Sequence, residues 1–131
     1  MLIPWTIEIK QLATQLRVGA DPQQPQAVSV DITIRALTPA FPQVIEDCMN
    51  YQPICAWVLR DWQARPHTPL MTTRVRELMT FIFDFDERIE AVDVSVAAGG
   101  VVVHRWESRP DFEQCAVELP RVPMPELYAL R

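Results

Sequence analysis

The chain has 131 residues, is 49% apolar and carries a formal net charge of −5 at pH 7. This length suits one globular domain with a hydrophobic core and is too short for two. The acidic balance and the absence of any run of lysine or arginine exclude an electrostatic basis for binding nucleic acid or an anionic membrane. No apolar stretch approaches the roughly 18 residues of a membrane-spanning helix.

The cysteines and the first residues of the chain indicate the cellular compartment of the protein. Cys48, Cys55 and Cys115 are odd in number and show no disulfide-framework spacing, so we expect reduced thiols. Residues 1–5 lack the basic region and the apolar core of a signal peptide. Together these features predict a cytoplasmic protein.

The first elements predicted in chain order are two strands. Residues 5–18 begin with alternating apolar and polar side chains, and residues 28–35 alternate more cleanly. Residues 19–26 between them have the composition of a loop. One strand face is therefore buried and the other is wetter, as in an antiparallel sheet. The buried positions of the second strand are Val28, Val30, Ile32 and Ile34.

A helix is predicted next, beginning at Asn50 or Tyr51 and ending at Arg65-Pro66. Pro53 suits its opening turn, where no amide donor is needed. The proline at its end disfavours a helical conformation for the residue before it. The core-facing positions, at helical spacing, are Ile54, Trp57, Val58 and Trp62.

A second helix should follow closely. Thr68 is expected as its N-cap, with Pro69 at the first helical position. Its apolar stripe consists of Met71, Val75, Leu78 and Ile82. The charged residues of the same segment, which we expect to lie largely outside that stripe, are Arg74, Arg76 and Glu77.

Two more strands complete the predicted domain. Residues 92–96 alternate, the chain then passes through Gly99-Gly100 to residues 101–106, and residues 112–119 are expected to supply the last strand. The order β-β-α-α-β-β predicts an α+β fold in which two helices cover one face of a four-stranded antiparallel sheet. We assign residues 1–119 to this single domain and residues 120–131 to a proline-rich C-terminal arm.

Four segments, in this order and spacing, resemble the dihydroneopterin aldolase family. Asp47-Cys48-Met49-Asn50-Tyr51 is similar to the family's Asp-x-hydrophobic-Ser/Asn-Tyr signature, and Val18-Gly19-Ala20-Asp21 is similar to its loop after strand one. Residues 70–74 occupy the place of its Leu-hydrophobic-Glu motif, and residues 92–96 match the strand that normally ends in Lys-Pro. The resemblance covers about residues 5–119. It implies the tunnelling fold, in which sheets from several subunits close into a barrel, and cleavage of dihydroneopterin without a metal at sites between subunits.

The family's polar site groups are mostly replaced in this chain. By resemblance, the family tyrosine is Tyr51, the pterin-holding glutamate is Thr72, the lysine is Ala98, and the loop glutamate falls near Gln23 or Gln24. A carboxylate accepts two parallel N–H bonds from an aminopyrimidine edge, and a threonine hydroxyl cannot. Loss of a positioned acid–base group typically lowers the rate by about 10²–10⁴. The resemblance therefore indicates a divergent member with impaired or altered chemistry.

Three functions are compatible with these residues. The first is a pterin- or heterocycle-binding protein of folate or pterin metabolism, whose pocket forms where Tyr51, Met71, Thr72 and Ala98 converge across a subunit interface, with Gln24 nearby. The second is a non-catalytic homo-oligomeric scaffold or interaction protein, in which Tyr51 is only a half-buried aromatic at a helix start. The third is a variant whose substrate lacks the aminopyrimidine edge. In each case we expect a homo-oligomer, a tetramer or an octamer.

No metal or other cofactor is expected. His67 and His104 are far apart in the chain and have no carboxylate or thiol at ligand spacing. The glycine pair Gly99-Gly100 indicates a turn between strands rather than a phosphate-binding loop, because no wider glycine pattern surrounds it.

Overall fold

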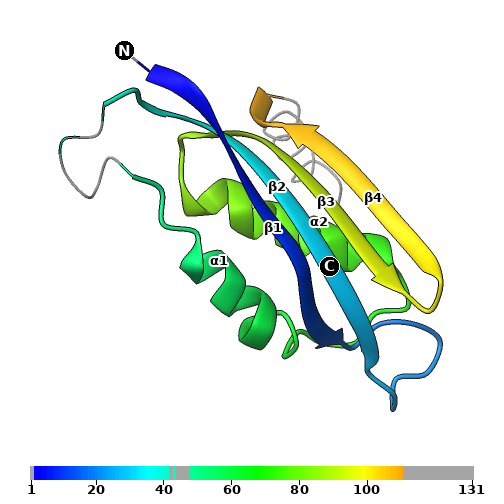
Figure 1. Cartoon of the computed structure of the whole chain (residues 1–131). Helices are drawn as coiled ribbons and strands as arrows, with labels where there is room; N and C mark the ends of the chain where they lie inside the picture. Colours follow the sequence, from blue (N-terminus) through cyan, green and yellow to red (C-terminus); the bar gives the residue numbers. More distant parts are fainter. Residues whose placement is uncertain (1, 42, 44–47, 111–131) are drawn as a thin grey trace, which may run out of the picture.

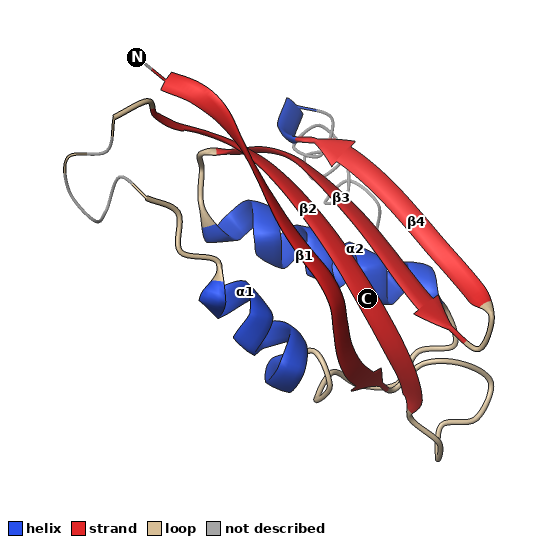
Figure 2. Cartoon of the chain, in the orientation of Figure 1, coloured by secondary structure: helices blue, strands red, loops and turns tan. Residues whose placement is uncertain are grey.

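Four antiparallel strands and two helical segments make up the computed structural model, which describes residues 2–41, 43 and 48–110. Figures 1 and 2 show both helical segments on the same face of the sheet, which confirms the predicted α+β class and element order. None of the helices in these ranges is long and apolar enough to cross a membrane. The sheet order is β1-β2-β3-β4, and the elements are β1 (Leu2–Leu16), β2 (Gln26–Pro39), α1 (Gln52–Ala56), the π-helical turn η2 (Trp57–Asp61), α2 (Met71–Phe85), β3 (Ile89–Ala98) and β4 (Val101–Ser108).

The core lies between the sheet and the helices. The alternation predicted for residues 28–35 is confirmed, and its apolar positions are 0–5% exposed. Ile54, Val58 and Trp62 from the first helical segment are fully buried against this face. Burying a large apolar side chain contributes roughly 1.5–3 kcal/mol, so these two apolar stripes fix the helices on one side. The fully or almost fully buried residues of α2 are Arg74, Val75, Leu78, Met79, Ile82 and Phe83.

A bulge in β1 changes which positions face the core. The register with β2 shifts between Ile9 and Leu12, and Gln11 adopts φ 56°. The Gln11 amide donates to Oδ1 of Asp31 at 2.7 Å, which satisfies an amide that the bulge removes from the ladder. Before the bulge Ile9 points inward, whereas after it Thr14 and Leu16 do. A simple two-residue alternation therefore does not describe the whole strand.

The second helix begins later than predicted. Its first residue is Met71 and its N-cap is Leu70, so Thr68 is not the cap and Pro69 is not in the helix. Thr68 instead forms an isolated parallel bridge with Val18, and its Oγ1 accepts the Leu70 amide at 3.3 Å. Because Thr68 pairs with Val18, its backbone is extended, and the helix begins only at Met71.

The fourth strand also differs from the prediction. It is β4, directly after β3, and the two are joined by Gly99 (φ 57°) and Gly100 (φ 84°). Two residues with positive φ make the turn that matches the twist of a tight hairpin, and glycine adopts this conformation readily. Ala98 and Val101 pair across the turn. Residues 112–119, predicted as the last strand, and the predicted arm 120–131 lie outside the described residues.

Candidate functional site

One end of the sheet gathers most of the predicted site. Here β1 ends at Leu16, β2 begins at Gln26, β3 ends at Ala98 and α2 begins at Met71. Figure 1 shows the β1–β2 loop, the β3–β4 turn and the start of α2 at this end. We call it the loop end of the domain. The antiparallel register brings these segments to the same end, because it places Leu16 opposite Gln26 and the last residues of β3 beside the first of β2.

The β1–β2 loop is tied to the segment before α2. The Gly19 amide donates to the Thr68 carbonyl at 3.1 Å, and the Thr68 amide donates to the Arg17 carbonyl at 3.2 Å. His67 Nε2 lies 2.8 Å from the Gly19 carbonyl, and because that oxygen can only accept, Nε2 donates. Further along the loop, Asp21 Oδ1 accepts the Gln23 amide at 2.9 Å. Sequence reasoning assigned no role to His67, since its partner is a backbone atom 48 residues away.

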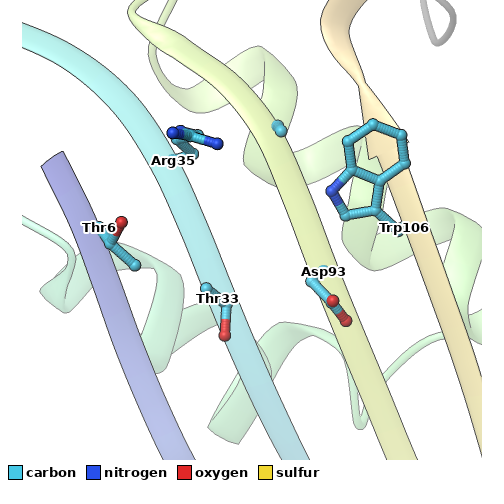
Figure 3. A pocket seen from close by; sticks show the side chains of 6 residues that line it. Thr6, Thr33, Arg35, Asp93 and Trp106 are labelled. Atoms are coloured by element: carbon cyan, nitrogen blue, oxygen red, sulfur yellow. The ribbon is translucent and has the colours of Figure 1, made fainter. Parts of the chain in front are cut away.

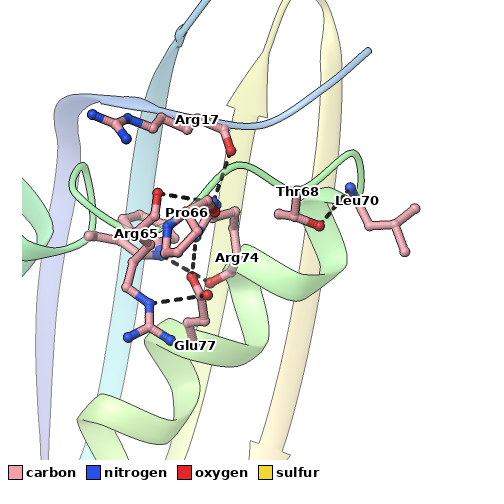
Figure 4. Close-up of polar contacts among 8 residues, drawn as sticks. Arg17, Arg65, Pro66, Thr68, Leu70, Arg74 and Glu77 are labelled. Atoms are coloured by element: carbon pink, nitrogen blue, oxygen red, sulfur yellow. Dashed lines mark hydrogen bonds and ion pairs between the residues drawn. The ribbon is translucent and has the colours of Figure 1, made fainter. Parts of the chain in front are cut away.

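A buried arginine fixes the same end. Arg74 is 0% exposed, which corrects the expectation that it lies outside the apolar stripe. Its Nη1 donates to Glu77 Oε1 at 2.7 Å, and its Nη2 donates to the carbonyls of Arg17 at 2.9 Å, Arg65 at 3.4 Å and Pro66 (Figure 4). The planar, always charged guanidinium supplies several donors in a fixed geometry, and the buried side chain uses them on a carboxylate and on backbone carbonyls. Arg74 therefore joins the end of β1, the turn before α2 and α2 itself.

The predicted site residues at the loop end carry little reactive chemistry. Thr72, in the first turn of α2, is exposed, and Met71 beside it is partly buried against the core. Ala98 ends β3 and is partly buried, and Gln24 lies exposed in the β1–β2 loop. The single lysine, Lys10, lies beside the bulge on β1, so β2 separates it from Ala98 within one chain.

Tyr51 lies away from the loop end. It is the N-cap of α1 and its side chain is 44% exposed. The other end of this helical segment reaches the end of β1, because Thr14 Oγ1 donates to the Val58 carbonyl at 3.1 Å and accepts from Gln63 Nε2 at 2.8 Å. One chain therefore brings Gln24, Met71, Thr72 and Ala98 to one end and leaves Tyr51 at the far end of the first helical segment.

The start of α1 explains the position of Tyr51. Asn50 Oδ1 accepts the Gln52 amide at 3.1 Å, and the Tyr51 carbonyl accepts the Ile54 amide at 3.0 Å. Asparagine before the first turn and Pro53 within it are residues that begin helices readily. These local bonds leave the phenol ring of Tyr51 on the surface, available to a neighbouring molecule.

The described residues of the loop end contain no cluster of metal-binding side chains. Within residues 2–41, 43 and 48–110, no group of three or more histidine, cysteine, aspartate or glutamate side chains could hold a metal ion. Among the described residues, the two groups with a clear pKa shift lie elsewhere. Burial raises the pKa of Cys55 on α1, and hydrogen bonding to Arg88 lowers the pKa of Asp86 after α2.

Comparison with known proteins supports the architecture. No protein-family model and no curated protein matches the chain. Among solved structures, a provisionally assigned dihydroneopterin aldolase (FolB) from Vibrio cholerae is similar, with TM-score 0.67, 15% identity, and coverage of 79% of this chain and 97% of that one. A dihydroneopterin aldolase from Burkholderia thailandensis, bound to guanine, has TM-score 0.60, 15% identity, and coverage of 81% of this chain and 92% of that one. The chain therefore has the tunnelling fold of these aldolases, as its sequence predicted.

Proposed function

We propose that this chain is a divergent dihydroneopterin-aldolase-like protein of pterin or folate metabolism. It binds a pterin or a related heterocycle between copies of itself and has impaired or altered aldolase activity. The main support for the proposal is that one tunnelling-fold chain places its candidate site residues at two different ends of the domain. Thr72 and Ala98 lie at the loop end, whereas Tyr51 lies at the far end of the first helical segment. A pocket containing all three requires a second copy.

The surface of the sheet supports assembly. β1 and β4 are its two edge strands. Exposed apolar side chains occur on both, with Leu2 60% exposed on β1 and Val101 and Val102 63% and 62% exposed on β4. Edge strands carry unpaired backbone groups that readily pair with another chain. A closed homo-oligomer, a tetramer or an octamer, would bury the exposed apolar side chains and pair the backbone groups of the edge strands.

The chemistry of the loop end limits the expected activity. Thr72 offers one hydroxyl where two parallel acceptors would hold an aminopyrimidine edge. Ala98 offers no proton donor or acceptor at its side chain. A bound heterocycle would gain mainly from apolar contact, from stacking and from backbone groups, so weak pterin affinity is expected.

A binding titration tests the proposal most directly. Neopterin and dihydroneopterin are titrated into the purified protein by calorimetry, beside an assay for released glycolaldehyde. Saturable binding that weakens in Tyr51→Ala, while the exposed control Gln52→Ala leaves it unchanged, supports the pterin-binding reading. Absence of binding by an assembled, folded protein favours the second candidate, a non-catalytic scaffold. The threonine and alanine at the proposed positions of the aldolase glutamate and lysine support this candidate.

A further inference from the structure

The sheet face that the helices leave uncovered contains a hollow of about 170 Å³ near the start of β3. Two neighbouring rows of the sheet register form it. In one row Arg35 pairs with Thr6 and Ala91, and in the next Asp93 pairs with Thr33 and Trp106. Ala91 has only a methyl side chain, so it leaves the floor of the hollow open between larger neighbours. The lining residues, shown in Figure 3, are Thr6, Thr33, Arg35, Ala91, Asp93 and Trp106.

The hollow lies far from the loop end. Ala91 and Ala98 are seven residues apart on β3, and at a rise of 3.3 Å per residue this is about 23 Å. The hollow is also on the open face of the sheet, whereas α2 and its first turn lie on the covered face (Figure 2). It is therefore separate from the site proposed above.

Arg35 and Trp106 line the hollow with a guanidinium and an indole that are both unengaged in the described part of the chain. Within the described residues, the Arg35 guanidinium makes no hydrogen bond or ion pair, and the indole N–H of Trp106 has no hydrogen-bond partner. Trp106 is 55% exposed, although tryptophan usually buries most of its ring. In Figure 3 the two side chains stand on either side of β3, on the neighbouring strands β2 and β4. A cation and an aromatic face are thus both open to a ligand.

Asp93 is held in place by a histidine. His104 Nε2 lies 2.6 Å from Asp93 Oδ1, across the β3–β4 ladder. The second oxygen, Oδ2, has no partner among the described residues and can accept a further N–H. Asp93 is the diagonal neighbour of Arg35, at about 7–8 Å between such positions, and the two form no ion pair. A ring can therefore fit between the guanidinium and the carboxylate. Glu8 continues the Asp93 row on β1 without lining the hollow.

We propose that this hollow binds a single-ring aromatic or heteroaromatic carboxylate that also carries an N–H donor. Arg35 holds the carboxylate, since a guanidinium matches its two oxygens with two parallel donors. Trp106 stacks on the ring, and Asp93 Oδ2 accepts the N–H at the other side of the ring. The volume suits one ring, because a cavity of about 150 Å³ admits benzene. The Thr6 and Thr33 hydroxyls supply further polar contacts at the rim.

Three matched compounds test the proposal on the unmodified protein. 4-Aminobenzoate has both groups, benzoate lacks the N–H donor, and aniline lacks the carboxylate. Binding is followed through the indole N–H signals of Trp5, Trp57, Trp62 and Trp106 in two-dimensional NMR. We expect 4-aminobenzoate to shift the Trp106 signal saturably, with benzoate and aniline each binding at least tenfold more weakly. Equal responses to all three compounds, or none at Trp106 up to the solubility limit, overturn the proposal.

Variants then assign the groups. Arg35→Gln should weaken binding of both carboxylates at least tenfold and leave aniline unaffected, whereas Arg60→Gln, an exposed arginine on η2, should change nothing. Asp93→Asn should abolish the preference for 4-aminobenzoate over benzoate. The melting temperature of each variant checks folding. If Arg35→Gln and Arg60→Gln bind all three compounds alike, the hollow is not the site.

Discussion

Arg74 Nη1 and Glu77 Oε1 lie 2.7 Å apart on the first turns of α2, and the Arg74 side chain is completely buried. The same guanidinium also holds backbone carbonyls from β1 and from the turn before α2. This pair is consequently a structural centre of the loop end, where the candidate pterin site lies. Its loss should affect both the stability of the fold and the shape of that site.

Replacing Arg74 with methionine should lower the free energy of unfolding by about 3–5 kcal/mol, because Glu77 loses its closer arginine partner and three backbone carbonyls lose their charged donor. Arg76→Met, at a partly buried arginine two positions away, is the control and should have a small effect. Guanidinium unfolding of the two variants measures the difference. Equal losses would mean that the Arg74 contacts contribute no net stability.

The turn between α2 and β3 should make stability depend on acid pH. Arg88 Nη2 lies 2.8 Å from Asp86 Oδ2, and this contact lowers the pKa of Asp86 in the folded protein. The pair therefore stabilises the fold above the unfolded pKa of about 3.9, and the stabilisation is lost as pH falls through the lower folded value.

Asp86→Asn should consequently reduce the free energy of unfolding at neutral pH and converge with the parent protein in strong acid. Urea unfolding at a series of pH values provides the measurement. Asp84→Asn, at an exposed carboxylate on α2, is the matched control and should show no such convergence. A pH-independent difference for Asp86→Asn would refute the ion-pair explanation.

Assembly should depend on the β4 edge. The parent protein is expected to scatter light as a tetramer or an octamer rather than as a 15.1 kDa monomer. Val102→Glu places a charge on the exposed edge strand and should shift the population toward the monomer. Leu59→Glu makes the same kind of change at a 41% exposed residue on η2 and should leave the assembly intact. A monomeric parent protein at micromolar concentration would exclude the inter-subunit pocket.

Retro-aldol cleavage of dihydroneopterin should be negligible. Typical enzymes turn over at about 10 s⁻¹, and under the proposed correspondence of Ala98 with the aldolase lysine the loss of an acid–base group should lower this by roughly 10²–10⁴. Glycolaldehyde release is the measurement. A rate within tenfold of the typical value would contradict the expectation and direct attention to Lys10, with Lys10→Ala as the next variant.

Introducing the aldolase glutamate and lysine at the proposed corresponding positions should strengthen pterin binding. In Thr72→Glu/Ala98→Lys, each new charged hydrogen bond that forms well is expected to contribute about 1.5–3 kcal/mol to the affinity for neopterin. Thr80→Glu/Ala64→Lys introduces the same charges at exposed positions outside the proposed site residues and serves as the control. If calorimetry shows no gain for the first pair in a folded oligomer, the residue correspondence with the aldolases is wrong.

The sequence by itself determined the elements whose patterns are local. Alternation along β2 and the stripes at Ile54, Val58 and Trp62 identify faces that must leave water, and the apolar side chains alone carry that signal. The resemblance in four short segments added the tunnelling fold, which the structural neighbours bear out. The glycine pair Gly99-Gly100 also predicted the turn between β3 and β4, since such a pair between apolar runs is a local turn signal.

Only the tertiary structure decided which polar residues matter. A hydropathy pattern places Arg74 outside the core because its side chain is charged. The structure buries it, because its partners include a carbonyl 57 residues away in the chain, which no local pattern reveals. The bulge at Gln11 depends on Asp31 of the neighbouring strand, and the start of α2 depends on a bridge to Val18. The separation of Tyr51 from Thr72, and the hollow between Arg35 and Trp106, arise from strand register and helix placement, which bring together side chains with no short-range relation in the sequence.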